Sequence, residues 1–204
     1  SLCLQGRLVL DGSKSISNRV LLIRALCKEY FPIHNLSTSN DTKAMQNALL
    51  QKSLRKDVGA AGTTMRFLTA YLSSLSGGSR YLLTGSARMQ ERPIGILVAA
   101  LRQLGADIIY VNKTGYPPLL IKGSHLSGGR LSIAADISSQ YLSALLLIAP
   151  TLSNGLELVL EGTLVSRPYL LMTLKTMAYF GIHYTWEGNT ISIAPQQYLS
   201  LIHI

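Results

Sequence analysis

Residues 11–19, with the sequence Asp-Gly-Ser-Lys-Ser-Ile-Ser-Asn-Arg, place two cations and three hydroxyls directly before an apolar run at 20–23. The apolar run predicts the body of a helix, so the polar residues lie at its N-terminus. The first N–H groups of a helix lack partners and form the positive end of its dipole, which favours a phosphate or a carboxylate. Ser15 and Arg19 are four residues apart and share one helix face, with Lys14 just before them. We therefore predict an anion site at this N-terminus.

Other predicted helices begin in a similar way. Residues 60–66, Ala-Ala-Gly-Thr-Thr-Met-Arg, precede an apolar run, and Gly62 allows a ligand to approach the backbone. Residues 138–140, Ser-Ser-Gln, precede another apolar run. Each feature alone has an ordinary structural explanation, because Ser and Thr often cap helices and Gly often forms turns. Their recurrence at several helix N-termini favours a binding function.

The sequence contains an internal repeat with an offset of roughly 75 residues. A helical run at 67–72 is followed by a strand-like run between two glycines, and Arg92-Pro93 then opens a second helix. The same order recurs from a helical run at 141–146 to a second helix opened by Arg167-Pro168, which follows Ser166. Pro suits the first turn of a helix, and Gly at 105 and 181 suits the C-terminal end. Two strands are expected after each second helix, at 107–111, 119–122, 182–186 and 190–193.

The repeated unit is therefore βαβαββ, and a strand at 131–133 opens one copy. A shorter first copy is expected from residue 8 to about residue 58. It would have a helix starting at Lys14, a strand at 31–36 and a helix at 42–50, and it would lack the closing hairpin. This pattern predicts an α+β fold with pseudo-threefold internal symmetry.

Composition restricts the partners. The 204 residues suffice for one large or two small domains, and 48% are hydrophobic, which is typical of a globular protein. Charged residues make up only 14%, yet the net charge is +9, so acidic partners are indicated. The basic residues are dispersed along the chain rather than clustered, which favours small anionic ligands over nucleic acid.

Several classes of site are disfavoured. Cys3 and Cys27 form no CxxC pair, and the four histidines show no metal-ligand spacing, so no metal and a reducing, cytoplasmic location are expected. The longest central apolar run, at 144–150, is far too short to span a bilayer. The spacing GxxxxGK[ST] of a nucleotide-binding P-loop is absent.

Taken together, these segments resemble the family of 5-enolpyruvylshikimate-3-phosphate (EPSP) synthases. The resemblance covers nearly everything from Leu8 to Pro195, and its segments occur in the order of the family. They are residues 12–19, 35–41, 61–66, 88–95, 138–140 and 164–169. The family fold has two domains, each built from three βαβαββ units with helices packed inside sheets, and the active site lies between the domains. The resemblance implies that residues 11–198 form one such domain and that residues 1–10 are a remnant of the crossover strand from the other.

The resemblance also implies a reaction, in which the 5-hydroxyl of shikimate 3-phosphate adds to the enol carbon of phosphoenolpyruvate and phosphate leaves. It implies no cofactor, no membrane or nucleic-acid partner, a monomer when complete, and inhibition by glyphosate. By motif, Lys14 would contact both substrates and Gln140 would lie between them. The acid and base residues of the family would lie in the second domain, so no catalytic residue is expected here. Tyr169 would line the pocket for shikimate 3-phosphate. This substrate would contact Ser15, Arg19, Ser138, Ser139 and Ser166, and phosphoenolpyruvate would contact Gly62 and Arg92.

The sequence departs from the family pattern at two positions of the site. Asp11 stands where the family commonly has Pro, and its carboxylate is unfavourable beside a phosphate unless it turns away. Ala60 stands where the family commonly has Asn, so one side-chain contact is lost. Residues 199–204 fit neither the preceding strand nor a turn, and we interpret them as a non-native tail that resembles a translated sequencing adapter.

Three other interpretations remain open at this stage. A UDP-N-acetylglucosamine enolpyruvyl transferase would share the fold and the chemistry, although residues 138–140 and 88–95 favour the shikimate enzyme. The chain by itself could be a phosphate-binding fragment without turnover, and this is what we expect of the 204 residues alone. An RNA-binding protein of related architecture is disfavoured by the dispersed charge.

Overall fold

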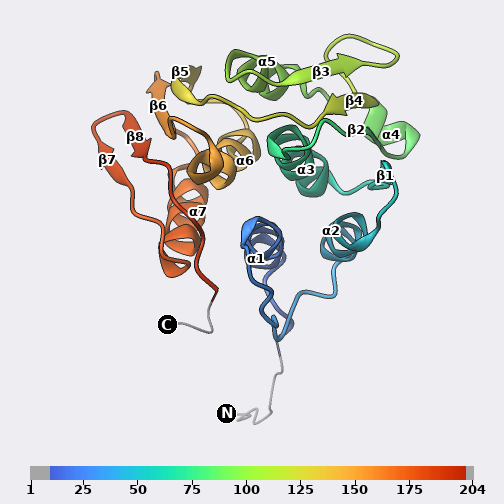
Figure 1. Ribbon diagram of the computed structural model, residues 1–204, viewed down its shortest axis with the longest axis horizontal. Helices are drawn as coiled ribbons and strands as arrows, with labels where there is room; N and C mark the ends of the chain where they lie inside the picture. Colours follow the sequence, from blue (N-terminus) through green and yellow to red (C-terminus); the bar gives the residue numbers. More distant parts are fainter. Residues whose placement is uncertain (1–9, 201–204) are drawn as a thin grey trace, which may run out of the picture.

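The computed structural model describes residues 10–200, in which helices lie inside and β-sheet covers two sides (Figure 1). The described chain begins with two helices, α1 (Lys14–Leu26) and α2 (Asn40–Leu50). The first complete repeat then comprises β1 (Arg55–Asp57), α3 (Gly62–Ser74), β2 (Arg80–Thr84), the short α4 (Ala87–Gln90), α5 (Gly95–Gln103), β3 (Asp107–Tyr110) and β4 (Leu119–Lys122). The next comprises β5 (Gly129–Ala134), α6 (Ser139–Ile148) with a 3-10 turn at Ala149–Thr151, β6 (Leu156–Glu161), α7 (Arg167–Tyr179), β7 (Thr185–Glu187) and β8 (Thr190–Ile193).

The two sheets formed by the described residues share one topology. Their strand orders are β1-β2-β4-β3 and β5-β6-β8-β7. In each sheet the first strand runs parallel to its neighbour, and the other neighbours are antiparallel. The structure therefore confirms the α+β class and the βαβαββ pattern of the two longer repeats.

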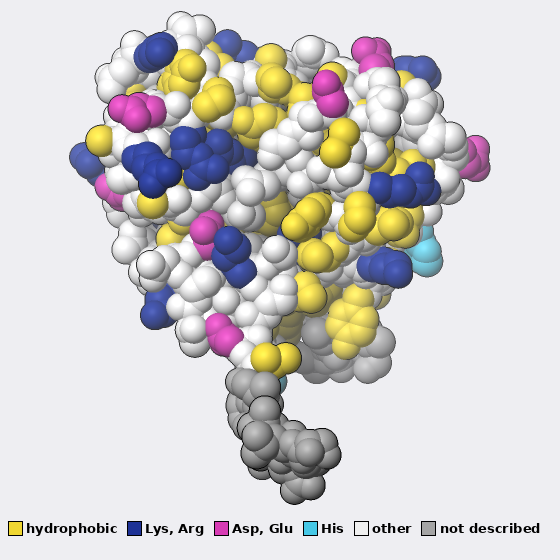
Figure 2. Space-filling model, turned by 180° about the vertical axis from the view of Figure 1, so that it is seen from behind, with side chains coloured by type: hydrophobic (Ala, Val, Ile, Leu, Met, Phe, Trp, Pro, Cys, Tyr) yellow, Lys and Arg dark blue, Asp and Glu magenta, His cyan; other side chains and the backbone are white. Residues whose placement is uncertain are grey.

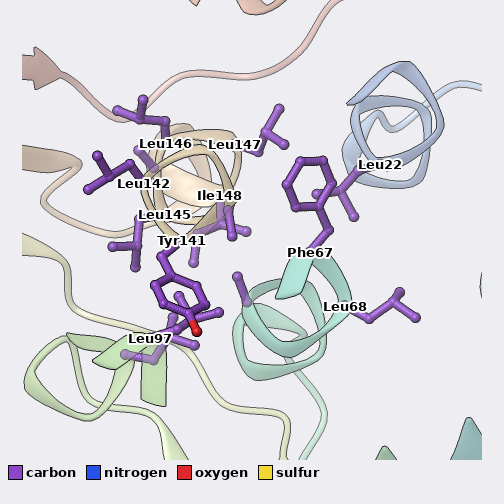
Figure 3. Close-up of a cluster of buried hydrophobic side chains, with 14 of the residues drawn as sticks. Leu22, Phe67, Leu68, Leu97, Tyr141, Leu142, Leu145, Leu146, Leu147 and Ile148 are labelled. Carbon is purple, nitrogen blue, oxygen red and sulfur yellow. The ribbon is translucent and has the colours of Figure 1, made fainter. Parts of the chain in front are cut away.

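The helices form a cyclic core. The first helices of the three repeats, α1, α3 and α6, contact one another, and each second helix packs against the first helix of the following repeat: α2 on α3, α5 on α6 and α7 on α1. Residues 142–148 of α6 are completely buried at the centre. Figure 3 shows five of these side chains, those of Leu142, Leu145, Leu146, Leu147 and Ile148. Phe67 of α3, with Leu22 of α1 beside it, and Leu97 of α5 lie next to this group. Burial of this apolar surface is the main favourable contribution to the fold.

Proline and glycine set the helix boundaries largely as expected. Pro168 occupies the first turn of α7, where its missing N–H is harmless. Gly105 and Gly181 follow α5 and α7 with φ of 103° and 84°, a region that favours glycine. Helix α5 begins only at Gly95, so Arg92-Pro93 forms the turn before this helix rather than its first turn.

Two predicted strands are wrong in part or completely. Residues 31–36 form no strand, because Pro32 has no N–H to donate and Asn35 adopts a φ of 54°, which breaks an extended segment. Of the strand expected at 182–186, only its end is present, since β7 covers Thr185–Glu187. Ile182 instead donates its N–H to the carbonyl of Met177 at 3.1 Å, at the end of α7.

The two ends of the chain test the sequence predictions only in small part. Residues 1–9 of the expected crossover remnant lie outside the described residues, as do residues 201–204 of the expected tail. Leu199 donates its N–H to the Phe180 carbonyl at 3.0 Å, and Ser200 Oγ lies 3.0 Å from Glu29 Oε2. The domain limits and the non-native tail remain predictions.

Candidate functional site

A pocket of about 330 Å³ lies where the N-terminal ends of four helices meet. These are the first helices of the three repeats, α1, α3 and α6, together with α7. Four positive helix ends aimed at one pocket favour a bound anion. The lining residues are Lys14, Ser15 and Arg19 of α1, Thr63 and Phe67 of α3, Ser139 and Gln140 of α6, and Tyr169 of α7.

Arg19 is the buried cation of this pocket, since only 4% of its surface is exposed. Its Nε donates to Thr173 Oγ1 at 2.7 Å, and its Nη2 donates to Ser143 Oγ at 3.0 Å. Its Nη1 donates to the Ser15 carbonyl at 2.8 Å. Burial lowers the pKa of Arg19 to about 10, so the guanidinium is still charged at neutral pH.

No carboxylate among the described residues forms an ion pair with Arg19. A buried charge without an opposite charge is unfavourable for stability, so a protein retains one mainly where it serves a function. The guanidinium lies at a pocket lined by the N-termini of helices. This combination indicates a negatively charged ligand.

Lys14 provides the second cation at the mouth of the same pocket. About half of its side chain is exposed, and its Nζ lies 3.9 Å from Asp41 Oδ2 at the start of α2. An ion pair of this length and exposure contributes little to stability. The ammonium group therefore remains able to approach a ligand from solvent.

A second pocket, of about 480 Å³, is lined by Ala60, Arg88, Met89 and Arg92. Gly62, the first residue of α3, lies against it: a Cβ at this position would be 2.5 Å from Arg92 Nη1. The N-cap of α3 is Ala61, which has no side-chain acceptor, so no side chain at this position caps the first N–H groups of the helix. Backbone N–H groups and a guanidinium thus lie together at this end of α3.

Figure 2 shows Lys and Arg side chains dispersed over one face of the molecule, with hydrophobic and acidic side chains among them. No group of three or more His, Cys, Asp or Glu residues that could hold a metal ion occurs between residues 10 and 200. In the same range, no helix is long and apolar enough to cross a bilayer.

The structure brings most of the predicted site residues together. Lys14, Ser15, Arg19, Ser139, Gln140 and Tyr169 share the first pocket, and Gly62 and Arg92 meet at the second. Ser138 is the N-cap of α6 and accepts a hydrogen bond from Gln140 N at 3.4 Å, so it has a capping role. Ser166 is the N-cap of α7 but makes no capping bond with its side chain. Neither serine is among the residues that line the first pocket.

The Asp11 side chain does not line the anion pocket, where its negative charge would repel an anion. Its Oδ2 accepts hydrogen bonds from the N–H and the hydroxyl of Thr38, at 2.8 and 2.9 Å. These bonds lower the pKa of the Asp11 carboxyl below its usual value. The carboxylate is thereby engaged in the loop before α2.

Sequence reasoning noted Arg19 of α1 and Arg66 of α3 but missed the partners that hold their guanidinium groups. Ser143 and Thr173 position the Arg19 guanidinium, but each lies more than 100 positions away in the sequence. Arg66 of α3 is 5% exposed and donates to the carbonyls of Gly62 and Pro93 at 3.1 and 3.2 Å. The only sequence signal that relates the two arginines is spacing: Arg66 follows Gly62 by four residues, as Arg19 follows Ser15.

Comparison with known protein families gives a consistent result. A family model described as EPSP synthase (3-phosphoshikimate 1-carboxyvinyltransferase) matches residues 2–51 and 48–204. A relative from Bacteroides fragilis named 3-phosphoshikimate 1-carboxyvinyltransferase is 51% identical over 190 residues, which cover 93% of this chain and 46% of the relative. A relative of the same name from Haemophilus influenzae is 42% identical over 231 residues, covering 96% of this chain and 53% of the relative.

Solved structures show the same fold. An EPSP synthase structure from Acinetobacter baumannii superimposes with a TM-score of 0.81 at 22% identity, over 96% of this chain and 48% of the other. At this identity the likeness concerns the fold alone. The chain spans about half the length of the curated relatives it matches.

Proposed function

Because this chain belongs to the EPSP synthase family, we propose that its protein transfers the carboxyvinyl group of phosphoenolpyruvate to the 5-hydroxyl of shikimate 3-phosphate and releases phosphate. The described residues supply one wall of the substrate cleft. The observation that carries this proposal is Arg19, a buried cation without a carboxylate partner among the described residues, at a pocket formed by four helix N-termini.

Shikimate 3-phosphate fits the first pocket by its chemistry. The phosphate carries charge for Arg19 and Lys14, and the ring hydroxyls match the polar side chains of Ser15, Ser139 and Gln140. Ser138, Ser166 and Tyr169 complete this assignment at the N-terminal ends of α6 and α7. Arg suits the task because its planar donors hold an anion in a fixed orientation.

Phosphoenolpyruvate fits the second pocket. Its phosphate and carboxylate would lie against Arg92 and the backbone N–H groups that begin at Gly62. Lys14 stands at the mouth of the first pocket and would contact both substrates. With the two anions held side by side, the attacking hydroxyl and the enol carbon are placed for reaction, which removes most of the entropic barrier to their encounter.

The residues of this chain bind, orient and neutralise charge. In the reaction, the 5-hydroxyl oxygen bonds to the enol carbon and loses its proton while the methylene carbon gains one, which gives a tetrahedral ketal. Phosphate then leaves, and loss of a methyl proton restores the double bond. None of the residues that line the two pockets carries a carboxylate. We therefore propose that the acid and base are not among the residues that line these two pockets.

Phosphate release from the two substrates tests the proposal. The protein translated from the complete reading frame should release phosphate only when both substrates are present, and this 204-residue chain alone should release none. Arg19→Ala should abolish most of the activity. Arg130→Ala is the matched control, since Arg130 pairs with Glu157 at the exposed surface at 2.8 Å.

The outcomes separate the candidate functions. Phosphate release with UDP-N-acetylglucosamine in place of shikimate 3-phosphate would assign the protein to the related transferase. Phosphate release by the isolated 204-residue chain would contradict the proposal that this chain binds the substrates but does not supply the acid and base. The cytoplasmic location, the monomeric state and inhibition by glyphosate remain predictions of the same proposal.

A further inference from the structure

Tyr141 lies between the two pockets but lines neither of them. It directly follows Gln140, yet its side chain leaves α6 on another face and extends toward α5, near Leu97 (Figure 3). The residue is only 8% exposed. Its hydroxyl donates a hydrogen bond of 2.6 Å to the carbonyl of Pro93, which precedes α5. A bond of this length connects the third repeat directly to the second.

The Pro93 carbonyl is held from two sides. Arg66 Nη2 donates to it at 3.2 Å, while Arg66 Nη1 donates to the Gly62 carbonyl at 3.1 Å. The Arg66 guanidinium also lies 5.9 Å from the centre of the Tyr141 ring. Tyr141 and Arg66 together therefore fix the two backbone points, at 62 and 93, that flank the second pocket.

These two points control Arg92. A proline disfavours the helical backbone conformation for the residue before it, so the position of Pro93 restricts the direction in which Arg92 leaves the chain. The Arg92 guanidinium in turn occupies the space beside Gly62 that a side chain would fill. A small movement of the Pro93 carbonyl would therefore move the guanidinium away from Gly62.

We propose that Tyr141 is a positioning residue, whose hydroxyl holds the Arg92-Pro93 step so that Arg92 faces the second anion. This role rests on the proposed function and deepens it, because it assigns a structural link between the two substrate pockets. Tyr141 touches neither substrate. Its effect should therefore appear in the affinity for phosphoenolpyruvate and not in that for shikimate 3-phosphate.

The test is Tyr141→Phe in the protein from the complete reading frame, which removes one oxygen atom. The Pro93 carbonyl keeps its bond from Arg66, so no buried acceptor is left without a partner. We expect KM for phosphoenolpyruvate to rise about 3- to 10-fold, the range for loss of one hydrogen bond. KM for shikimate 3-phosphate should stay within about twofold.

Tyr198→Phe is the matched control, because the Tyr198 hydroxyl also donates to a backbone carbonyl, that of Leu147 in α6, at 2.8 Å. It removes a comparable buried bond far from Arg92 and should leave both KM values unchanged. Arg66→Lys provides a second measurement if Tyr141→Phe folds poorly. It keeps the charge, loses the two-point bridge between Gly62 and Pro93, and should raise KM for phosphoenolpyruvate selectively.

Each result has one meaning. A selective rise with Tyr141→Phe and none with Tyr198→Phe supports the positioning role. If Tyr141→Phe does not fold, a selective rise with Arg66→Lys supports the role and its absence overturns it. Equal KM values for Tyr141→Phe and the parent, or equal rises for both substrates, overturn it while the proposed function stands. If the parent itself shows no turnover with the two substrates, the proposed function fails, and the positioning role fails with it.

Discussion

Arg19 in α1 and Arg66 in α3 occupy matching places in successive repeats. Each guanidinium donates from Nη1 to the carbonyl four residues earlier, that of Ser15 at 2.8 Å and that of Gly62 at 3.1 Å. Both side chains are almost completely buried, and burial lowers the pKa of both. In α6 the matching place holds Ser143, which accepts a hydrogen bond from Arg19.

The surroundings of the two arginines differ. Arg19 reaches into the third repeat and lines a pocket, whereas Arg66 donates to Gly62 and Pro93 within its own repeat and lines neither pocket. One place in a repeated unit therefore holds a cation that lines a pocket in one copy and a cation that donates to backbone carbonyls in another. The difference lies in the partners that neighbouring repeats provide.

The largest effect is expected from Arg19→Met. Shikimate 3-phosphate affinity should fall by about 1.5–3 kcal/mol, or roughly 10- to 150-fold, because a hydrogen-bonded charge is lost. The melting temperature should not fall, because a buried charge without an ion-pair partner is replaced by an apolar side chain of similar size. The hydroxyls of Ser143 and Thr173 remain bonded to each other at 2.8 Å. Titration calorimetry and thermal unfolding measure the two quantities.

Arg66→Met tests the other half of the comparison. It should weaken phosphoenolpyruvate binding more than shikimate 3-phosphate binding, because the carbonyls of Gly62 and Pro93 lose their common donor. If both arginine variants weakened the same substrate most strongly, the distinction between a binding and a positioning arginine would be wrong.

A medium effect is expected from Gly62→Ala. The new Cβ would lie 2.5 Å from Arg92 Nη1, and the flexible guanidinium can move aside, so the fold should be kept. KM for phosphoenolpyruvate should rise about tenfold, equivalent to ~1.4 kcal/mol. Gly95→Ala is the control, since its nearest neighbour is 3.4 Å away and its φ is not positive. Unchanged kinetics in Gly62→Ala would place phosphoenolpyruvate elsewhere.

The smallest effect is expected from Asp11→Asn, which loosens the loop before α2 and leaves the second pocket untouched. The hydrogen bonds from Thr38 lower the pKa of Asp11 in the folded state, so its contribution to stability is present above pH 3.8. That contribution is lost as the pH falls through the lowered pKa. Melting temperatures of variant and parent should therefore differ slightly at pH 7, and the difference should shrink as the pH falls below 3.8. A difference that does not shrink with falling pH would assign the effect to shape instead of charge.

The sequence was sufficient to predict the repeat and most of the helix N-termini, although it placed the start of α5 too early, at Arg92-Pro93 instead of Gly95. Both depend on local signals, such as Pro168 in a first turn, Gly181 after a helix, and Ser138 before one. Strand β1 was not predicted, because Arg55–Asp57 carries three charges and no apolar alternation. It becomes a strand only through parallel pairing with β2, a long-range effect that no local pattern contains.

The same limit applies to the site. Lys14, Arg19 and Gly62 stood out by residue type and position at helix N-termini. The roles of Tyr141 and Arg66 depend on where the Pro93 carbonyl lies, which is decided by packing between repeats. Residues that act through backbone atoms of another element carry no signature in their own neighbourhood.

The contacts of Arg19 also bear on how the protein is made. Two of its partners, Ser143 and Thr173, lie 124 and 154 positions further along the chain. During synthesis from the N-terminus, α1 therefore emerges long before the hydroxyls that hold its guanidinium exist. Such distant contacts form late in folding. The anion pocket should therefore be among the last parts to assemble, and substrate should be unable to stabilise a nascent chain that stops before α7.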